Sequence, residues 1–242
     1  MTSDLVPFAS HPVCTFKWHD HFKVKFQKIG SFINKNNIRI SMHPDQFTLI
    51  NSPDENIFIR SKRELLYHTE VLDLMQLDTS AKVQIHIGGV YNDKEKSINR
   101  FITRFNRLNT AIKKRLVIEN DDKCYTVNDC LIINKQTKIP ILFDVFHHSI
   151  NTFDLPLTEI LRLVGRTWRS KDGLPMLDYS SQQKGGRRGQ HAETIDVRDF
   201  KKFINNTNGF DCDIMLEIKD KEKSTLKAIK AISKSTLCVE RD

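Results

Sequence analysis

The sequence predicts a single α/β domain of the (β/α)8 TIM-barrel class. Short apolar runs rich in β-branched residues alternate with longer amphipathic segments, which is typical of repeated strand–helix units. The apolar runs are continuous, as expected of parallel strands that are buried on both faces. A chain of 242 residues also falls in the size range of one barrel, about 250 residues. We therefore expect residues 1–242 to form one domain.

The predicted elements follow in chain order. Residues 5–9 resemble the end of a strand, and a helix is expected over about 19–33. The other predicted strands are 38–42, 83–87, 116–118, 140–145, 174–179 and 214–218, and the other helices are 57–77, 96–113, 126–134, 196–205 and 221–233. This gives seven strands, whereas a closed barrel has eight. The sequence therefore predicts a barrel that lacks its first strand and helix.

Acids and histidines recur where the predicted strands end. They are His43, His86, Glu119, Asp144, His147, Asp178, His191 and Glu217. The carboxyl ends of barrel strands converge on one face, and imidazoles and carboxylates are the ligands that divalent ions use in hydrolytic sites. Any one histidine could be an ordinary structural side chain. The whole set predicts a metal centre, because carboxylates buried at strand ends are costly without ions or partners.

Seven motifs occur in an order that resembles the UV damage endonuclease family, which is related to endonuclease IV and to xylose isomerase-like barrels. They are His43-Pro44-Asp45-Gln46-Phe47, His86-Ile87-Gly88-Gly89, Glu119-Asn120-Asp121-Asp122, Asp144-Val145-Phe146-His147-His148, Asp178-Tyr179-Ser180-Ser181-Gln182, Gly186-Arg187-Arg188-Gly189-Gln190-His191 and Glu217-Ile218-Lys219-Asp220-Lys221-Glu222. The resemblance runs from about residue 3 to residue 221. One such motif would be weak evidence, but seven in order are specific.

The resemblance implies a DNA repair endonuclease that nicks the backbone 5′ to cyclobutane dimers, 6-4 photoproducts and some other lesions. A metal-bound hydroxide would attack and leave a 3′ hydroxyl and a 5′ phosphate. Two or three divalent ions are implied, typically Mn²⁺, with Zn²⁺, Co²⁺ or Mg²⁺ as alternatives. The implied ligands are His11, His43, His86, Glu119, Asp144, His147, Asp178, His191 and Glu217. Glu119 would bridge two ions as a catalytic residue, whereas His11 is either a ligand or a loop histidine.

The resemblance also implies residues that contact DNA. Gln46 and Phe47 match a pair that wedges into the duplex at damaged bases, although Phe47 could instead cap the barrel core. The glycine-containing loop over 180–189 carries Lys184, Arg187 and Arg188, which either clamp phosphates or form a solvated loop. Lys219 is a second candidate catalytic residue, either holding the scissile phosphate or neutralising the acid cluster.

Three departures from the family pattern are present. Asp178 stands where many members have a histidine, and Met176 where some have a modifiable lysine. The change to Asp178 alters the charge of the site and the ion that it prefers. The first strand and helix of the family are also missing, so we expect either a fragment or another segment that closes the sheet.

Composition limits the remaining possibilities. A net charge of +8 favours a polyanionic partner. The resemblance implies that this partner is damaged double-stranded DNA, and we expect the protein to be a monomer. The five cysteines form no CxxC pair or zinc-finger spacing, which suits packing roles in a reducing compartment. The sequence has no signal peptide or membrane span, so we expect an intracellular protein of the cytoplasm, nucleoid or another compartment that contains DNA.

Two other functions remain open. One is an abasic-site endonuclease or a sugar isomerase of the same barrel superfamily, which would share the strand-end ligands but not the pair Gln46 and Phe47. The other is a catalytically silent protein that only binds damaged DNA.

Overall fold

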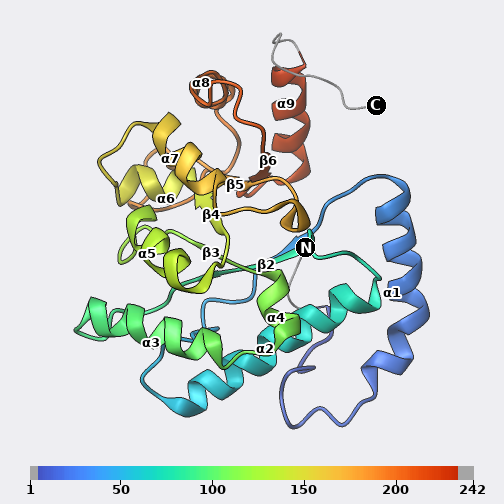
Figure 1. The fold of residues 1–242 in the computed structure, drawn as a ribbon. Coiled ribbons are helices and arrows are strands. Elements are labelled where there is room, and N and C mark those ends of the chain that lie inside the picture. Colours follow the sequence, from blue (N-terminus) through green and yellow to red (C-terminus); the bar gives the residue numbers. More distant parts are fainter. Residues whose placement is uncertain (1–4, 234–242) are drawn as a thin grey trace.

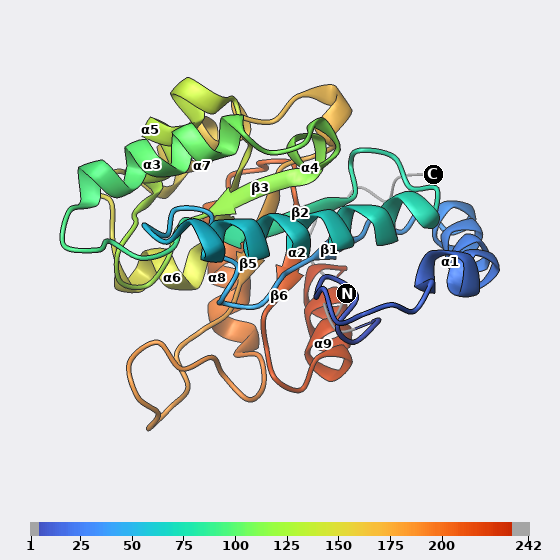
Figure 2. The same cartoon turned by 90° about the horizontal axis from the view of Figure 1, so that it is seen from below.

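A computed structural model describes residues 5–233 of the chain. Within this range, parallel strands form one sheet in the order β1 to β6. They are β1 (Ser41–Met42), β2 (Lys82–His86), β3 (Leu116–Glu119), β4 (Ile141–Asp144), β5 (Met176–Tyr179) and β6 (Asp213–Leu216). The sheet curls into a half-barrel (Figures 1 and 2), which confirms the predicted TIM-barrel-like α/β class. Leu116, Val117 and Ile118 of β3 are fully buried, as expected of a strand covered on both faces.

Side chains link the two edge strands of this sheet, β1 and β6. Nη1 of Arg39, just before β1, donates to Oδ2 of Asp213 in β6 at 2.5 Å and to the carbonyl oxygen of Leu174 at 2.6 Å. Oγ of Ser41 in β1 lies 2.7 Å from Sδ of Met215 in β6. The sheet therefore curls until its edge strands meet through their side chains.

Helices follow one another around the outside of the sheet (Figure 1). They are α1 (Trp18–Lys35), α2 (Glu55–Leu74), α3 (Lys94–Asn106), α4 (Thr110–Arg115), α5 (Val127–Thr137), α6 (Val145–Ile150), α7 (Leu157–Gly165), α8 (Val197–Asn206) and α9 (Glu222–Ile232). Aspartates begin several of them: Asp54, Asp93 and Asp196 each accept a backbone N–H of the first turn. Such caps satisfy donors that have no partner inside a helix. These caps therefore set the residue at which each loop ends and its helix begins.

The prediction of a strand at 5–9 is wrong, because this segment consists of bends and turns. The backbone N–H of Ala9 bonds to the carbonyl of Val6, and Phe8 has φ of 59°. A positive φ at a residue other than glycine is incompatible with a strand. The N–H of Val6 donates to the hydroxyl of Tyr67 in α2, so this segment is anchored to a helix. The described sheet accordingly has six strands and not seven.

The other differences concern helices. The predicted helix 96–113 is divided into α3 and α4, because a new helix starts after Asn109, whose carbonyl accepts the N–H of Lys113. The helices α6 and α7 and a 3-10 turn at Ser170–Asp172 were not predicted. No helix within residues 5–233 is long and apolar enough to cross a bilayer. The cysteines of this range are unpaired, and Cys238 lies outside the described residues.

Candidate metal centre

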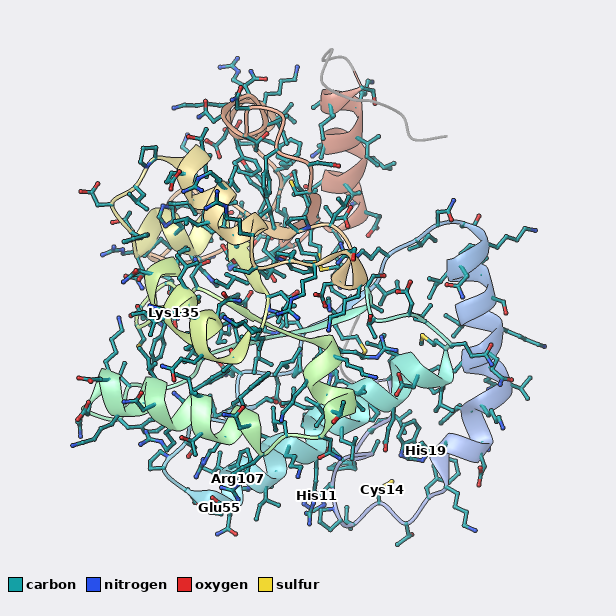
Figure 3. All side chains as sticks on the ribbon, viewed as in Figure 1. His11, Cys14, His19, Glu55, Arg107 and Lys135 are labelled. Atoms are coloured by element: carbon teal, nitrogen blue, oxygen red, sulfur yellow. The ribbon has the colours of Figure 1, made fainter. Side chains whose placement is uncertain are left out.

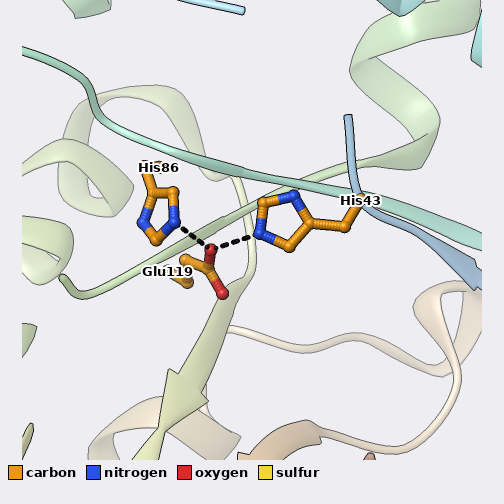
Figure 4. A group of neighbouring side chains, drawn as sticks. All are labelled: His43, His86 and Glu119. Carbon is orange, nitrogen blue, oxygen red and sulfur yellow. Dashed lines mark hydrogen bonds and ion pairs between the residues drawn. The ribbon is translucent and has the colours of Figure 1, made fainter. Parts of the chain in front are cut away.

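Glu119 lies at the centre of the site, at the end of β3, and its side chain is almost fully buried. Its Oε1 is 2.9 Å from Nε2 of His43 and 3.1 Å from Nε2 of His86, as Figure 4 shows. The two histidines come from the ends of β1 and β2, and His86 stands opposite Glu119 in the parallel register. One carboxylate oxygen and two imidazoles from neighbouring strands thus converge on one point.

A second group of potential ligands shares the same glutamate. Glu119, Asp144 and Asp178 end or lie within β3, β4 and β5, and each offers a ligand atom within 4.8 Å of the other two. All three are about 1% exposed. Asp144 and Asp178 are paired in the register of β4 and β5. Glu119 therefore belongs to a nitrogen-rich group on one side and to a carboxylate group on the other.

Four histidines form a row across this end of the sheet. Ring centroids are 5.4 Å apart for His43 and His86, 5.6 Å for His86 and His147, and 5.8 Å for His147 and His191. Nδ1 of His191 lies 3.8 Å from Oε2 of Glu217. The structure thus gathers every predicted ligand except His11, although their roles as metal ligands stay predictions.

His11 lies apart from both groups in the part of the chain that the structure describes. It is exposed in the N-terminal turns (Figure 3), and its Nδ1 accepts the backbone N–H of Val13. It lines a cavity of about 360 Å³ together with Asp45, Phe47 and Glu64. Its role as a ligand stays a prediction.

The charges of the first group compensate one another. Burial lowers the pKa of His43, but the charge and hydrogen bond of Glu119, together with the charge of Glu217, more than reverse this effect and raise the pKa to about 9. Burial raises the pKa of Glu119, but the charges of His86 and His43 bring it down to about 2. In the absence of another cation, protonated imidazole therefore stabilises the buried carboxylate.

The other two carboxylates of the second group, Asp144 and Asp178, are compensated less well than Glu119. Burial raises the pKa of Asp144 to about 8, against the attraction of His147. Burial also raises the pKa of Asp178 well above its usual range, and the negative charges of Glu217 and Glu119 add to this effect. Within the described residues, Oδ1 of Asp178 is buried without a hydrogen-bond partner. Buried carboxylates this close together are stable in their charged form only beside cations, so the donor set fits a divalent ion.

Two buried amides, to which the sequence assigned no role, hold these ligands. The side chain of Asn120 donates to the carbonyl of Asp144 at 2.9 Å and accepts its N–H at 3.0 Å. The backbone carbonyl of Asn120 also lies 3.1 Å from Nδ1 of His147. Gln84 of β2 contacts the carboxylates of Asp178 and Glu119. Its signal in the sequence was a polar residue inside an apolar strand, two positions before His86 and therefore on the same face.

The pair Gln46 and Phe47 lies in an exposed turn that follows His43. Oδ1 of Asp45 accepts the N–H of Phe47 at 2.8 Å, and the carbonyl of Asp45 accepts the N–H of Thr48. Phe47 is 71% exposed. The alternative that Phe47 caps the barrel core is therefore wrong. The turn exposes an aromatic ring to solvent four residues after His43.

The loop between β5 and α8 projects from the body of the molecule (Figure 2). Its two arms pair through Gln182 and His191, so the loop also delivers His191 to the site. Lys184, Arg187 and Arg188 lie between these two residues and are exposed, and Nη2 of Arg188 donates to the carbonyl of Ile150 at 2.8 Å. The ammonium of Lys219 pairs with Glu193 at the base of this loop and is half-exposed. Lys219, two residues beyond Glu217, is thus tied to the loop that carries His191.

Comparison of the sequence with known families and proteins gives one consistent result. The chain matches the family described as UV-endonuclease UvdE over residues 1–239. It is 39% identical over 234 residues to the UV DNA damage endonuclease of Clostridium perfringens, covering 95% of this chain but only 56% of that protein. It is 38% identical over 248 residues to the UV DNA damage endonuclease of Bacillus thuringiensis subsp. konkukian, covering 98% of this chain and 78% of that protein.

Solved structures agree with these sequence matches. The crystal structure of SacUVDE superposes with a TM-score of 0.91 at 47% identity, covering 96% of this chain and 78% of that one. Endonuclease IV from Thermus thermophilus matches with a TM-score of 0.63 at 12% identity, covering 95% of this chain and 87% of that one. At such low identity, the second match shows a shared barrel fold and nothing about activity.

Proposed function

The chain belongs to the UV-endonuclease UvdE family, and from this premise we propose that it is a metal-dependent DNA repair endonuclease that cuts the backbone 5′ to UV photoproducts. The observation that carries the proposal is Glu119, a buried carboxylate shared by two groups of metal-type ligands at the carboxyl ends of the strands. Barrel enzymes place their chemistry at this end of the sheet.

Divalent ions would be held by two sets of residues that share Glu119. The nitrogen-rich set is His43, His86 and Glu119, and the carboxylate set is Glu119, Asp144 and Asp178. His147, His191 and Glu217 would complete the ligands at the strand ends, and His11 stays a predicted ligand outside these sets. Bound ions supply an activated water and neutralise the charge that develops on the phosphate. We propose Mn²⁺ as the native ion, because the carboxylates of the site suit Mn²⁺.

The protein's own side chains would position the DNA. Arg187 and Arg188 of the projecting loop would contact phosphates, which fixes the duplex without reading its sequence. Lys219 would approach the scissile phosphate once it leaves Glu193. With these contacts the cut strand would lie across the end of the sheet.

Lesion recognition would depend on the exposed turn with Gln46 and Phe47. Inserting a ring between bases costs a few kcal/mol of unstacking, and less where a photoproduct already stacks and pairs badly. Selectivity would then come from the deformability of the duplex at cyclobutane dimers, 6-4 photoproducts and some other lesions. Sugar isomerases and epimerases of similar fold have no need for such an exposed wedge.

The test compares three duplexes that differ at one position: a cyclobutane pyrimidine dimer, an abasic site and an undamaged step. We expect Mn²⁺-dependent nicking of the dimer duplex well above that of the undamaged one. Preferred nicking of the abasic duplex would favour an abasic-site endonuclease. Tight binding of the dimer duplex without nicking in excess Mn²⁺ would identify a silent damage-binding protein.

We further propose that the chain acts as a monomer on damaged double-stranded DNA inside a compartment that contains DNA. The net charge of +8 supports a polyanionic partner, because lysine and arginine gain affinity by releasing counterions from phosphates. Light scattering of the protein alone and with one dimer-containing duplex would give the stoichiometry, with a 1:1 complex expected.

A further inference from the structure

Gln84 lies inside the curled sheet, between two of the carboxylates. It belongs to β2 and is 2% exposed. Its Nε2 donates to Oδ2 of Asp178 at 2.7 Å and approaches Oε2 of Glu119 at 3.4 Å. The amide therefore directs its Nε2 donor at two carboxyl groups that come from two other strands, β3 and β5.

These contacts make the two oxygens of Asp178 different. Oδ2 is held by Gln84, whereas Oδ1 has no hydrogen-bond partner among residues 5–233 although it is buried. An unpaired buried carboxylate oxygen is costly. A carboxylate oxygen of Asp178 lies within 4.8 Å of carboxylate oxygens of Glu119 and Asp144, close enough for all three to bind one ion. One oxygen is thus fixed by the protein and the other is free to bind an ion.

We propose that Gln84 is a positioning residue: it holds Oδ2 of Asp178 so that this carboxylate binds one divalent ion through a single oxygen, in a subsite made with Glu119 and Asp144 from oxygen ligands alone. The inference rests on the proposed function only in requiring that the site binds metal. Outer-shell hydrogen bonds orient ligands in this way in many metalloproteins.

The two halves of the site then differ in the ion that they prefer. The half with His43 and His86 offers imidazole nitrogens, which suit Zn²⁺ better than they suit Mg²⁺ or Mn²⁺. The carboxylate half offers only hard oxygen atoms, which suit Mg²⁺ and Mn²⁺. We therefore expect Mg²⁺ to compete with Mn²⁺ for the carboxylate half and Zn²⁺ to compete for the histidine half.

The experiment counts bound Mn²⁺ without DNA, from the electron paramagnetic resonance signal of the free ion during titration of metal-stripped protein. Gln84→Met keeps the size of the side chain and removes the donor. The matched control is Gln136→Met, the same change at an exposed position of α5. We expect Gln84→Met to weaken one class of Mn²⁺ sites by about 10- to 100-fold and to leave the other class and the control unchanged.

A double-mutant cycle shows whether Gln84 acts through Asp178. Adding Gln84→Met to Asp178→Ala should change Mn²⁺ affinity no further, because the positioned ligand is already absent. Circular dichroism of each metal-free variant reports folding, and Gln84→Asn, whose shorter amide cannot reach Asp178, provides a second test if Gln84→Met does not fold.

The outcomes separate this inference from the proposed function. Unchanged Mn²⁺ affinity in Gln84→Met, equal weakening of both classes, or a full additional effect in the Asp178→Ala background would overturn the positioning role while leaving metal-dependent nicking intact. A wild-type protein that binds no Mn²⁺ would instead overturn both.

Discussion

Nε2 of His43 lies 2.9 Å from Oε1 of Glu119, an ion pair in which the carboxylate is buried and the imidazole is about one-third exposed. This pair explains why the pKa of His43 rises to about 9 although burial alone would lower it. A protonated imidazole cannot bind a metal ion. Protons and metal ions therefore compete at His43.

We predict from this competition that Mn²⁺ binding releases protons. Below about pH 9 His43 of the metal-free protein is charged, so Mn²⁺ affinity should rise with pH up to that value, by at most about tenfold per pH unit for one proton. Calorimetric titration in two buffers of different ionisation enthalpy measures the protons released. His43→Gln should lower that number, whereas His19→Gln, at an exposed histidine paired with Glu70, should not. Proton release that is unchanged in His43→Gln would refute the competition.

Phe47→Ala should weaken binding to dimer-containing DNA by about 10- to 100-fold, because stacking of one base on an aromatic ring contributes about 1–3 kcal/mol. Binding to undamaged duplex should change much less. Fluorescence anisotropy with both duplexes measures the ratio. Phe32→Ala, at a 61% exposed position on α1, is the control and should bind like wild type. Equal loss on both duplexes would mean that Phe47 contributes general affinity and no recognition.

Charge removal at the projecting loop should reduce the salt dependence of DNA binding. If Arg187 contacts a phosphate, Arg187→Gln lowers the slope of log K against log salt concentration by about one. Lys135→Gln on α5, an exposed position labelled in Figure 3, should leave the slope unchanged. The slope is measured from affinities at several salt concentrations. If Arg187→Gln has the same slope as wild type, Arg187 makes no phosphate contact and the loop is an ordinary solvated loop.

The contact between the edge strands is expected to stabilise the fold. Nη1 of Arg39 bonds to Asp213 and to the carbonyl of Leu174, and its Nε and Nη2 bond to the carbonyls of Ser80 and Asp172. Lysine cannot reproduce this fork, so Arg39→Lys should lower the free energy of unfolding by about 1.5–3 kcal/mol. Urea unfolding measures the loss.

The matched control for Arg39→Lys is Arg63→Lys, the same change at an exposed position of α2. It should alter the free energy of unfolding by less than about 0.5 kcal/mol. Equal stability of Arg39→Lys and Arg63→Lys would mean that the edge strands stay together without the guanidinium.

The sequence predicted the sheet and the site more reliably than the segments between them. Continuous apolar runs predicted β2 to β6, because parallel strands that are covered on both faces are apolar along most of their length. Strand-end position located Glu119, because the barrel brings those ends together whatever the connecting helices do. Residues 5–9 are also apolar, but they form turns. Phe8 has a positive φ, and the N–H of Val6 donates to the hydroxyl of Tyr67 and not to a neighbouring strand.

The roles of Gln84 and Asn120 could not be read from the sequence, because each depends on a side-chain contact with another strand. Gln84 meets Asp178 across 94 positions. A buried amide in an apolar strand has many possible partners, and only the curl of the sheet selects one. Exposure of Phe47 likewise follows from the turn that Asp45 caps, which composition does not reveal.

We propose above that Glu119 is the shared ligand of a DNA-cutting metal centre. The most direct test compares wild type and Glu119→Gln on a duplex with one cyclobutane pyrimidine dimer, in Mn²⁺ and in chelator, with the cut mapped to the nucleotide. We predict that wild type makes a metal-dependent break immediately 5′ to the dimer. Glu119→Gln should bind the duplex with unchanged affinity and cut nothing, because a bridging charge is removed while the DNA-contacting surface remains. Cleavage by Glu119→Gln at the wild-type rate would mean that Glu119 is not an essential ligand. Cleavage by wild type in chelator would mean that the cut does not need a metal ion.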